Sequence, residues 1–280
     1  PETLPDDRLR LLFVCAHPAI DASMRSALML QTVLGIDAAR IGSAFLVAPA
    51  TMAKRLVRVK AKIKANGIRF EPPGPAGMPE RLRAVRGAIY AAYTLDWNGD
   101  DTTAPLADEA LFLAELVAAQ RPGEAEALGL LALLWLCEAR RPARLDAAGE
   151  FVPLDQQDTS RWDHDAIARA DRLLARAAAL HQVGPLQLEA ALQAAHCARA
   201  VTGNTPWPAI VHLYERLLDL APTVGARVGH AVASAMATGE PADGLALLQA
   251  IDPARVASYQ PWWAAQAHLS ALAGARDAAR

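Results

Sequence analysis

The sequence predicts an all-α protein, in which a helix-turn-helix domain is followed by a longer array of stacked helices. Hydrophobic residues make up 53% of the 280 residues and aromatic residues only 5%. The excess is mostly Ala and Leu, which favour helices over sheets. Amphipathic segments with helical spacing fill most of the chain, and turns rich in Pro and Gly separate them. This much apolar sequence excludes wholesale disorder.

The N-terminal region, residues 1–66, is expected to fold as a compact unit of short helices. Asp6 and Asp7 can cap the first helix, and Asp37 can cap the third. Pro49 suits the first position of the fourth helix, where its missing N–H is not needed. The expected helices cover residues 6–17, 22–34, 38–45 and 49–65.

A Pro/Gly-rich linker, residues 67–79, is predicted to divide this unit from a helical region, residues 80–280. From Pro185 onward the helices recur at a regular spacing. Trp207, Tyr214 and Leu217 resemble part of a tetratricopeptide-type (TPR) repeat, and Leu248 echoes it later, which predicts a stacked solenoid. The expected helices are 80–95, 105–120, 123–140, 163–180, 185–201, 206–220, 224–238, 241–250, 259–273 and 275 onward.

The charge is unevenly distributed along the chain. The formal net charge is −2, yet residues 38–70 contain eight basic and no acidic side chains. The remaining residues carry 20 basic and 30 acidic side chains. Such asymmetry indicates a basic nucleic-acid or membrane surface joined to an acidic body.

The helix expected over 49–65 has one apolar face and one basic face. Met52, Leu56, Val59 and Ile63 follow helical spacing and predict a buried seam. A basic stripe lies about a quarter turn away, where Lys and Arg can contact phosphates and Arg can read guanine. This helix lacks the Trp or Phe that anchor membrane-surface helices, and the plain alternative is a solvated basic face. The predicted DNA-binding residues are Thr51, Lys54, Arg55, Arg58, Lys60 and Lys62.

Residues 28–68 resemble region 4 of an extracytoplasmic-function (ECF) RNA polymerase sigma factor. Several later segments resemble the subgroup of these proteins with a long TPR-like helical extension, among them CEARRPARLD (137–146), LDQQDTSRWD (154–163) and QLEAALQAAH (187–196). The resemblance implies binding of the −35 promoter element, as double-stranded DNA, and of the β flap of the RNA polymerase core. By residue match, it places Thr51, Lys54, Arg55 and Arg58 against DNA. It also implies a regulatory protein or peptide as a partner of the extension.

Three departures from the family pattern stand out. Ala48 occupies a position where Ser or Thr usually caps the recognition helix, at a cost of about 1 kcal/mol. The segment after Tyr93, TLDWNGDD, differs from the subgroup. No segment resembles region 2, which in this family recognises the −10 element. We therefore expect a fragment or a degenerate member that does not initiate transcription alone.

A charged segment, residues 139–165, is the second candidate site. Paired carboxylates there could hold a cation and arginines could clamp an anion. The alternatives are a partner surface, or an ordered loop held by Arg–Asp pairs over a packed Trp162. The residues concerned are Arg140, Arg141, Arg144, Asp146, Asp155, Asp158, Arg161 and Trp162.

Catalytic and metal-binding motifs are not found in the sequence. It has no Gly-rich phosphate loop, GxSxG elbow or HExxH motif, so we expect no enzyme and no cofactor. The three cysteines lack CxxC spacing and the seven histidines show no ligand pairing, so we expect no metal. No apolar run is long enough to span a membrane and no signal peptide is visible, so we expect a cytoplasmic protein. The main alternative function is a TPR-like interaction scaffold with a vestigial helix-turn-helix.

Overall fold

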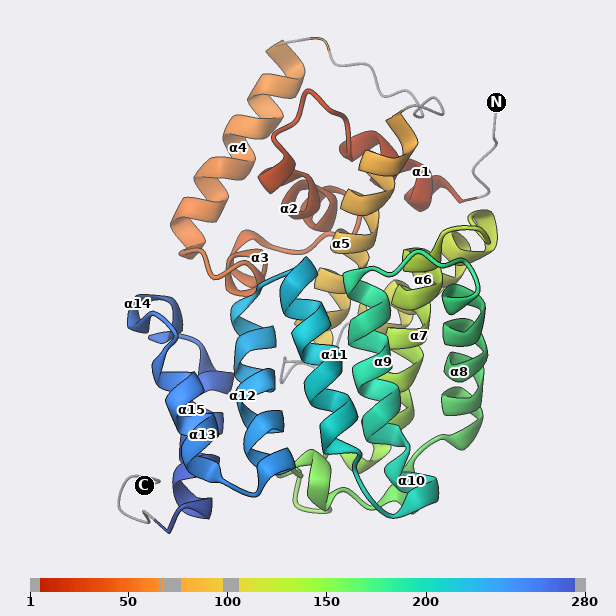
Figure 1. The fold of residues 1–280 in the computed structure, drawn as a ribbon. Helices are drawn as coiled ribbons and strands as arrows, with labels where there is room; N and C mark the ends of the chain where they lie inside the picture. Colours follow the sequence, from red (N-terminus) through yellow and green to blue (C-terminus); the bar gives the residue numbers. More distant parts are fainter. Residues whose placement is uncertain (1–5, 66, 68–76, 98–105, 275–280) are drawn as a thin grey trace. The chain divides into compact units, whose positions relative to one another are not determined.

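The computed structural model describes residues 6–65, 67, 77–97 and 106–274, and within these ranges the chain is all-α (Figure 1). The described part contains no β-strand, only an isolated antiparallel bridge between Leu145 and Phe151. None of its helices is long and apolar enough to cross a membrane. The chain forms two compact units, residues 1–123 and 124–280, which are described separately below.

The first unit is built around α5, which packs against α1, α2, α3 and α6. Three carboxylates cap helices here: Asp6 accepts from the amides of Arg8 and Leu9, Asp21 from that of Ser23, and Asp37 from those of Ala39 and Arg40. The predicted caps at Asp6 and Asp37 are therefore confirmed. The helices are α1 (Asp7–Cys15), α2 (Ala22–Thr32), α3 (Ala38–Ala44), α4 (Pro49–Ala65), α5 (Met78–Trp97) and α6 (Leu106–Gln120).

A tight turn joins α3 to α4, and Gly42 makes it possible. A Cβ atom on Gly42 would lie 2.6 Å from the carbonyl oxygen of Val47, which is backbone and cannot rotate away. The Val47 amide donates to the Gly42 carbonyl at 2.8 Å, and Leu46 takes a left-handed conformation with φ of 53°. Met52 and Leu56 of α4 are buried, and Val59 and Ile63 are half-buried, as the predicted seam requires.

Arg25 of α2 is a buried charge with several partners in the first unit. Its side chain is 6% exposed and donates to the carbonyls of Ile20 (3.0 Å) and Pro18 (3.2 Å) and to the Glu80 carboxylate (2.5 Å). These bonds tie the turn before α2 to the start of α5. The hydrogen bond from Arg25, together with its positive charge, lowers the pKa of Glu80 below its usual value.

Replacing Arg25 by Met should lower the free energy of unfolding of the first unit by about 2 kcal/mol, because the buried carbonyl of Ile20 and the partly buried carbonyl of Pro18 lose their donor. Hydrogen exchange of α2 and α5 amides measures this loss. Arg10→Met is the matched control: Arg10 is 57% exposed and pairs with Asp7 only at 3.6 Å, so its loss should cost less than about 0.5 kcal/mol. Equal protection in both variants would contradict this role for Arg25.

The boundary between the compact units lies between Gly123 and Glu124, later in the chain than the predicted linker 67–79. The reason is that α5 and α6, expected to begin the helical extension, pack against the N-terminal helices. Leu82, Val85, Ala88, Ile89 and Ala92 bury one face of α5 almost completely. Most of the segment 67–79, and the helix expected from residue 275, lie outside the described residues.

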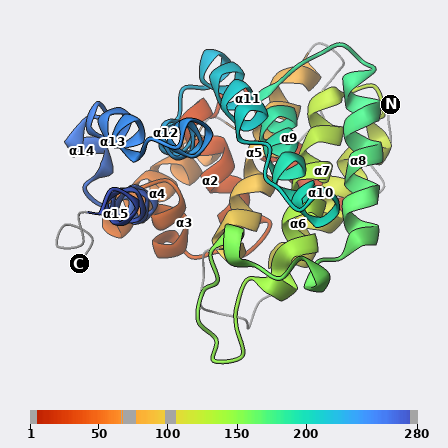
Figure 2. The same cartoon turned by 60° about the horizontal axis from the view of Figure 1, so that its bottom comes forward.

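In the second unit, successive long helices pack side by side (Figures 1 and 2). α7 contacts α8 and α9, α9 contacts α11, α11 contacts α12, and α12 contacts α13 and α15. Their positions agree closely with the predicted ranges. They are α7 (Ala125–Arg140), α8 (His164–Ala178), α9 (Pro185–Cys197), α10 (Arg199–Thr202), α11 (Trp207–Leu220), α12 (Val224–Thr238), α13 (Pro241–Gln249), α14 (Pro253–Val256) and α15 (Gln260–Leu272).

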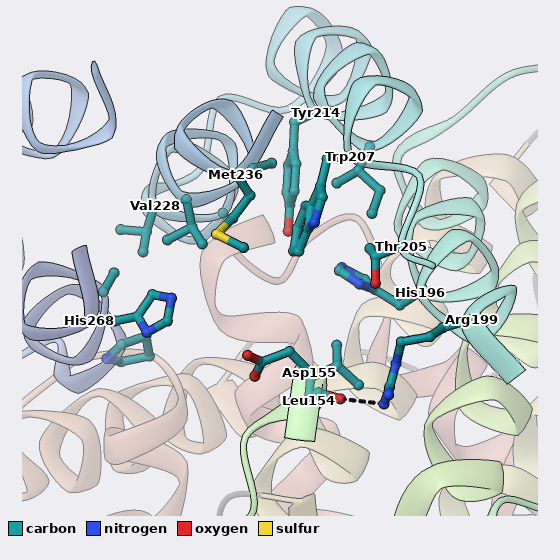
Figure 3. Close-up of a pocket in the computed structure, with 16 residues that line it drawn as sticks. Leu154, Asp155, His196, Arg199, Thr205, Trp207, Tyr214, Val228, Met236 and His268 are labelled. Carbon is teal, nitrogen blue, oxygen red and sulfur yellow. Dashed lines mark hydrogen bonds between the residues drawn. The ribbon is translucent and has the colours of Figure 1, made fainter. Parts of the chain in front are cut away.

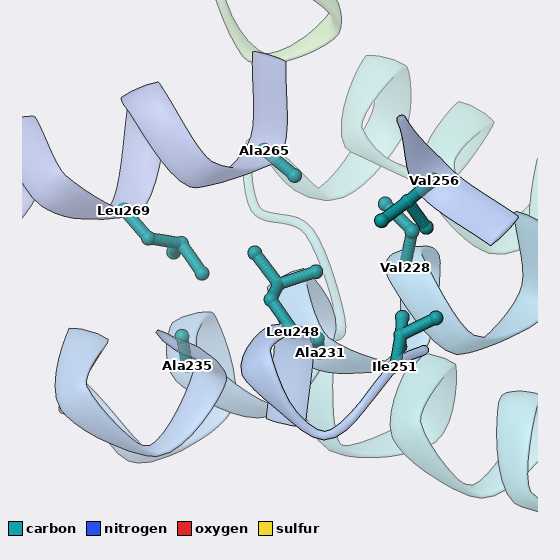
Figure 4. Packing of buried hydrophobic residues seen from close by; sticks show 8 residues of the cluster. All are labelled: Val228, Ala231, Ala235, Leu248, Ile251, Val256, Ala265 and Leu269. Carbon is teal, nitrogen blue, oxygen red and sulfur yellow. The ribbon is translucent and has the colours of Figure 1, made fainter. Parts of the chain in front are cut away.

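Apolar clusters hold these helices together. In the C-terminal cluster, Leu248 of α13 and Leu269 of α15 are fully buried against small residues of α12 (Figure 4). Close approach elsewhere depends on glycine: a Cβ atom on Gly129 of α7 would lie 2.8 Å from the backbone nitrogen of Gln187 in α9.

The side chain of Glu126 in α7 caps the N-terminus of α9, which lies about sixty residues later in the sequence. Gly184, the residue before α9, has no side chain to offer the first amides of that helix. The Glu126 carboxylate accepts instead from the amides of Leu186 (3.2 Å) and Gln187 (3.0 Å). Gly184 leaves room for this carboxylate, since a Cβ atom there would collide with it.

Candidate nucleic-acid interface and helical pocket

The basic face of α4 is open to solvent. Thr51, Lys54, Arg55, Arg58, Lys60 and Lys62 are all exposed. None of these cations forms an ion pair or hydrogen bond with another described residue. The structure thus brings the predicted residues together on one helix, with their charges uncompensated by close partners.

Two of these lysines act on groups of their own unit. Burial raises the pKa of the Cys15 thiol to about 11, against a smaller opposing effect of the Lys60 charge. The pKa of Asp21 is lowered mainly by its hydrogen bonds to Ser23, with a smaller contribution from Lys62. Lys54, Arg55 and Arg58 are exposed and form no ion pair or hydrogen bond with a described residue, so they are open to an external anion.

The charged loop 139–165 does not gather its residues around one centre. Arg140 is buried and donates to the carbonyl of Leu136 and to Gln193. Arg141 pairs with Glu138 at 2.7 Å. Arg144 lies over the exposed Phe151 ring, in a hairpin that extends toward the bottom of Figure 2. The arginines serve separate parts of the loop.

The carboxylates of this loop mainly cap turns. Asp146 accepts from the amides of Ala148 and Glu150, both at 2.9 Å. Asp158 accepts from the Ser160 amide and hydroxyl, which lowers the pKa of Asp158. Arg161 donates to the carbonyls of Leu145 and Pro142. At these positions the loop is therefore held mainly by hydrogen bonds between charged side chains and the backbone, where Arg–Asp pairs were expected.

Trp162 packs beneath the loop as expected. It is 3% exposed, and its indole nitrogen donates to Gln157 at 3.3 Å. The guanidinium of Arg199, the first residue of α10, lies over its ring at 5.1 Å and donates to the carbonyls of Leu154 and Gln157. Arg199 therefore fixes the short 3-10 turn η3 (Leu154–Gln156) against the helices.

A cavity of about 300 Å³ lies beside this turn, within the second unit (Figure 3). Its walls come from α11, α12 and α15, from the end of α9, and from η3. Of the predicted loop residues, Asp155 alone lines it. The sequence does not predict this cavity. It indicates Asp155 only as part of the charged loop and Trp207 only as part of the TPR-like pattern.

The aromatic end of the cavity is rigidly held. The ring of Trp207 meets that of His196 edge-on, with centroids 5.6 Å apart. Burial lowers the pKa of His196 to about 4, with further lowering by Arg140 and Arg199, so the imidazole is neutral. Tyr214 lies against Gly229 of α12, where a Cβ atom would come within 2.3 Å of the phenol oxygen. Burial raises the pKa of Tyr214 to about 12, so its hydroxyl keeps its proton.

No three His, Cys, Asp or Glu side chains of the described residues lie together as a metal site would require. Within the same residues, Cys15, Cys137 and Cys197 are unbridged, and burial raises the pKa of all three thiols.

Comparison with known proteins gives two matches. A family of unknown function, DUF6596, matches residues 81–178, which run from α5 to α8 and so include parts of both units. An uncharacterized protein of Rhizobium meliloti (strain 1021) is 38% identical over 248 residues, which cover 87% of this chain. The chain spans 58% of that relative's length. No solved structure matches the chain significantly.

Proposed function

We propose that this chain is the DNA-binding and regulatory part of an ECF sigma-factor-type transcription initiation protein. In this proposal α3, the turn at Leu46 and α4 form the helix-turn-helix of region 4, and α4 enters the major groove of the −35 promoter element. The observation that carries the proposal is the exposed, unpaired cationic face of α4, in a unit where Gly42 permits the tight turn.

The physical role of α4 is electrostatic docking followed by base contacts. Each Lys or Arg that neutralises a phosphate releases condensed counterions, which makes binding depend steeply on salt. Thr51, on the first turn, lies where a recognition helix contacts base edges, and Arg55 follows one turn later. The sequence outside residues 38–70 carries ten more acidic than basic residues, so it repels DNA and adds no affinity.

The other proposed partner is the RNA polymerase core, through the β flap. This partner rests on the family resemblance alone. The helical second unit is proposed as the regulatory extension, with TPR-like stacking of α11, α12, α13 and α15. Consecutive packing of these helices supports that arrangement.

Arg55→Ala and Arg58→Ala should each weaken binding of the chain to a duplex about tenfold at about 0.1 M salt. Each variant should also reduce the slope of log K against log salt by about one, because one phosphate contact is lost. Fluorescence anisotropy with a labelled duplex of random sequence, titrated at several salt concentrations, measures both quantities.

The matched control is Arg10→Ala, which removes one exposed positive charge from α1 of the same unit. It should change affinity and slope little. Unchanged affinity in both α4 variants, or an equal loss in the control, would remove α4 as the DNA-binding face.

An interaction scaffold with a vestigial helix-turn-helix is the second candidate. It is favoured by the side-by-side helices of the second unit and the cavity between them. Retention of the chain on purified polymerase core, combined with no duplex binding by the unaltered chain, would support the scaffold over the sigma-factor role.

A further inference from the structure

The cavity of the second unit has the size and lining of a small-molecule site. Its volume of about 300 Å³ lies at the lower end of the range for ligand pockets, which are mostly apolar with a few convergent polar groups. The apolar wall comes mainly from α12 and α15, with Val232, Met236 and Ala265 facing the space. A compact ligand with one apolar body would fill it.

Two hydrogen-bond donors at the aromatic end have no partner among the described residues. The Tyr214 hydroxyl and the Trp207 indole nitrogen both point into the cavity (Figure 3). Both residues are half-buried, so an oxygen acceptor on a ligand in the cavity can reach these donors. The neutral His196 beside Trp207 adds no charge there.

The opposite side of the cavity carries a carboxylate that has no hydrogen-bond partner among the described residues. Asp155 is the only acidic side chain that lines it, and no described residue donates a hydrogen bond to its carboxylate. In Figure 3 this carboxylate points toward the side where Met236 and His268 lie. Arg199, the cation on the rim, already donates to the carbonyls of Leu154 and Gln157. The lining thus carries one carboxylate and one guanidinium, and of these two groups only the Asp155 carboxylate has no hydrogen bond to a described residue.

We propose that this cavity binds a small aromatic amine. Its ammonium group pairs with Asp155, and its apolar body lies along Val232 and Met236. Its ring packs against Trp207 and Tyr214, and a ring oxygen accepts from their donors. Charge-assisted hydrogen bonds and aromatic faces are the features that recognise organic cations in proteins. The proposal is independent of DNA binding by α4.

The test uses the full chain and isothermal titration with tyramine, which has a primary amine and a phenol oxygen. The comparison ligand is 4-hydroxyphenylacetate, which keeps the phenol ring and replaces the amine by a carboxylate. We expect saturable binding of tyramine at least tenfold tighter than that of the acid. Asp155→Asn should weaken tyramine binding about tenfold and leave folding intact, because Asp155 is exposed and unbonded.

A second variant locates the site. Val232→Phe fills the cavity from α12 and should abolish binding of tyramine, while circular dichroism checks that the helices remain. The proposal is overturned if tyramine shows no saturable binding, if the acid binds as tightly, or if Asp155→Asn binds tyramine as well as the unaltered chain. Tyramine binding that survives in a folded Val232→Phe variant also overturns it.

Discussion

Replacing Leu248 by Ala should lower the free energy of unfolding of the second unit by about 4 kcal/mol. Leu248 is fully buried where α12, α13 and α15 meet, in one cluster with Ala231, Ala235 and Leu269 (Figure 4). Two of these neighbours are alanines that cannot expand into the space left behind. The loss therefore combines the transfer free energy of the missing atoms with the cost of a cavity, as in other buried Leu→Ala changes.

Urea unfolding followed by tryptophan fluorescence measures this change, because five of the six tryptophans, all but Trp97, belong to the second unit. Leu247→Ala is the control: the neighbouring side chain has the same composition but is 39% exposed, so it should cost no more than about 1 kcal/mol. Similar losses in the two variants would show that α13 does not pack as described.

Gly129→Leu should destabilise the same unit by about 3 kcal/mol. At this position α7 and α9 approach so closely that a Cβ atom would lie 2.8 Å from the nitrogen and 3.0 Å from the Cα of Gln187. Backbone atoms cannot rotate away, so α9 has to move, and overpacking of this kind outweighs the gain in helix propensity. The displacement would also pull the first amides of α9 from the Glu126 carboxylate.

The comparison for this prediction is Gly87→Ala in α5. Gly87 is exposed in mid-helix, and its nearest contact for a Cβ atom is the Ser26 hydroxyl oxygen at an ordinary 3.5 Å. This variant should gain about 1 kcal/mol from helix propensity. Circular-dichroism unfolding curves follow both variants, and tryptophan fluorescence follows the second unit in Gly129→Leu. A Gly129→Leu variant as stable as the unaltered chain would contradict the close approach.

The sequence predicts the ends of helices well where a capping or helix-breaking residue lies at the end itself. Asp37, Pro49 and Gly239 each mark an end through chemistry within one or two residues, and the helices begin or end there. The short α14 was missed although Asp252 caps the Ala254 amide and Pro253 follows at the first helical position. These residues fall between the expected helices 241–250 and 259–273, where the sequence predicts only a turn.

The packing of helices into units depends on long-range contacts, which sequence patterns specify poorly. A Pro/Gly-rich segment suggested a boundary at 67–79, but the buried face of α5 fits the N-terminal helices. The cavity is harder still to predict from local patterns, because the residues that line it are spread along the chain from Leu154 to His268. Each of them, taken alone, matches an ordinary core or loop position. Trp207 and Tyr214, seven residues apart on one helical face, were the only signal available.

The Glu126 cap has a consequence for the order in which the second unit forms. The first amides of α9 find their acceptor on α7, so α9 gains that stabilisation only after the two helices have docked. Helix formation and docking are then one cooperative step, because an uncapped N-terminus frays in isolation. A nascent chain would hold α7 and α8 before α9 becomes persistent, and amides at the start of α9 should exchange with solvent only when the α7–α9 pair opens.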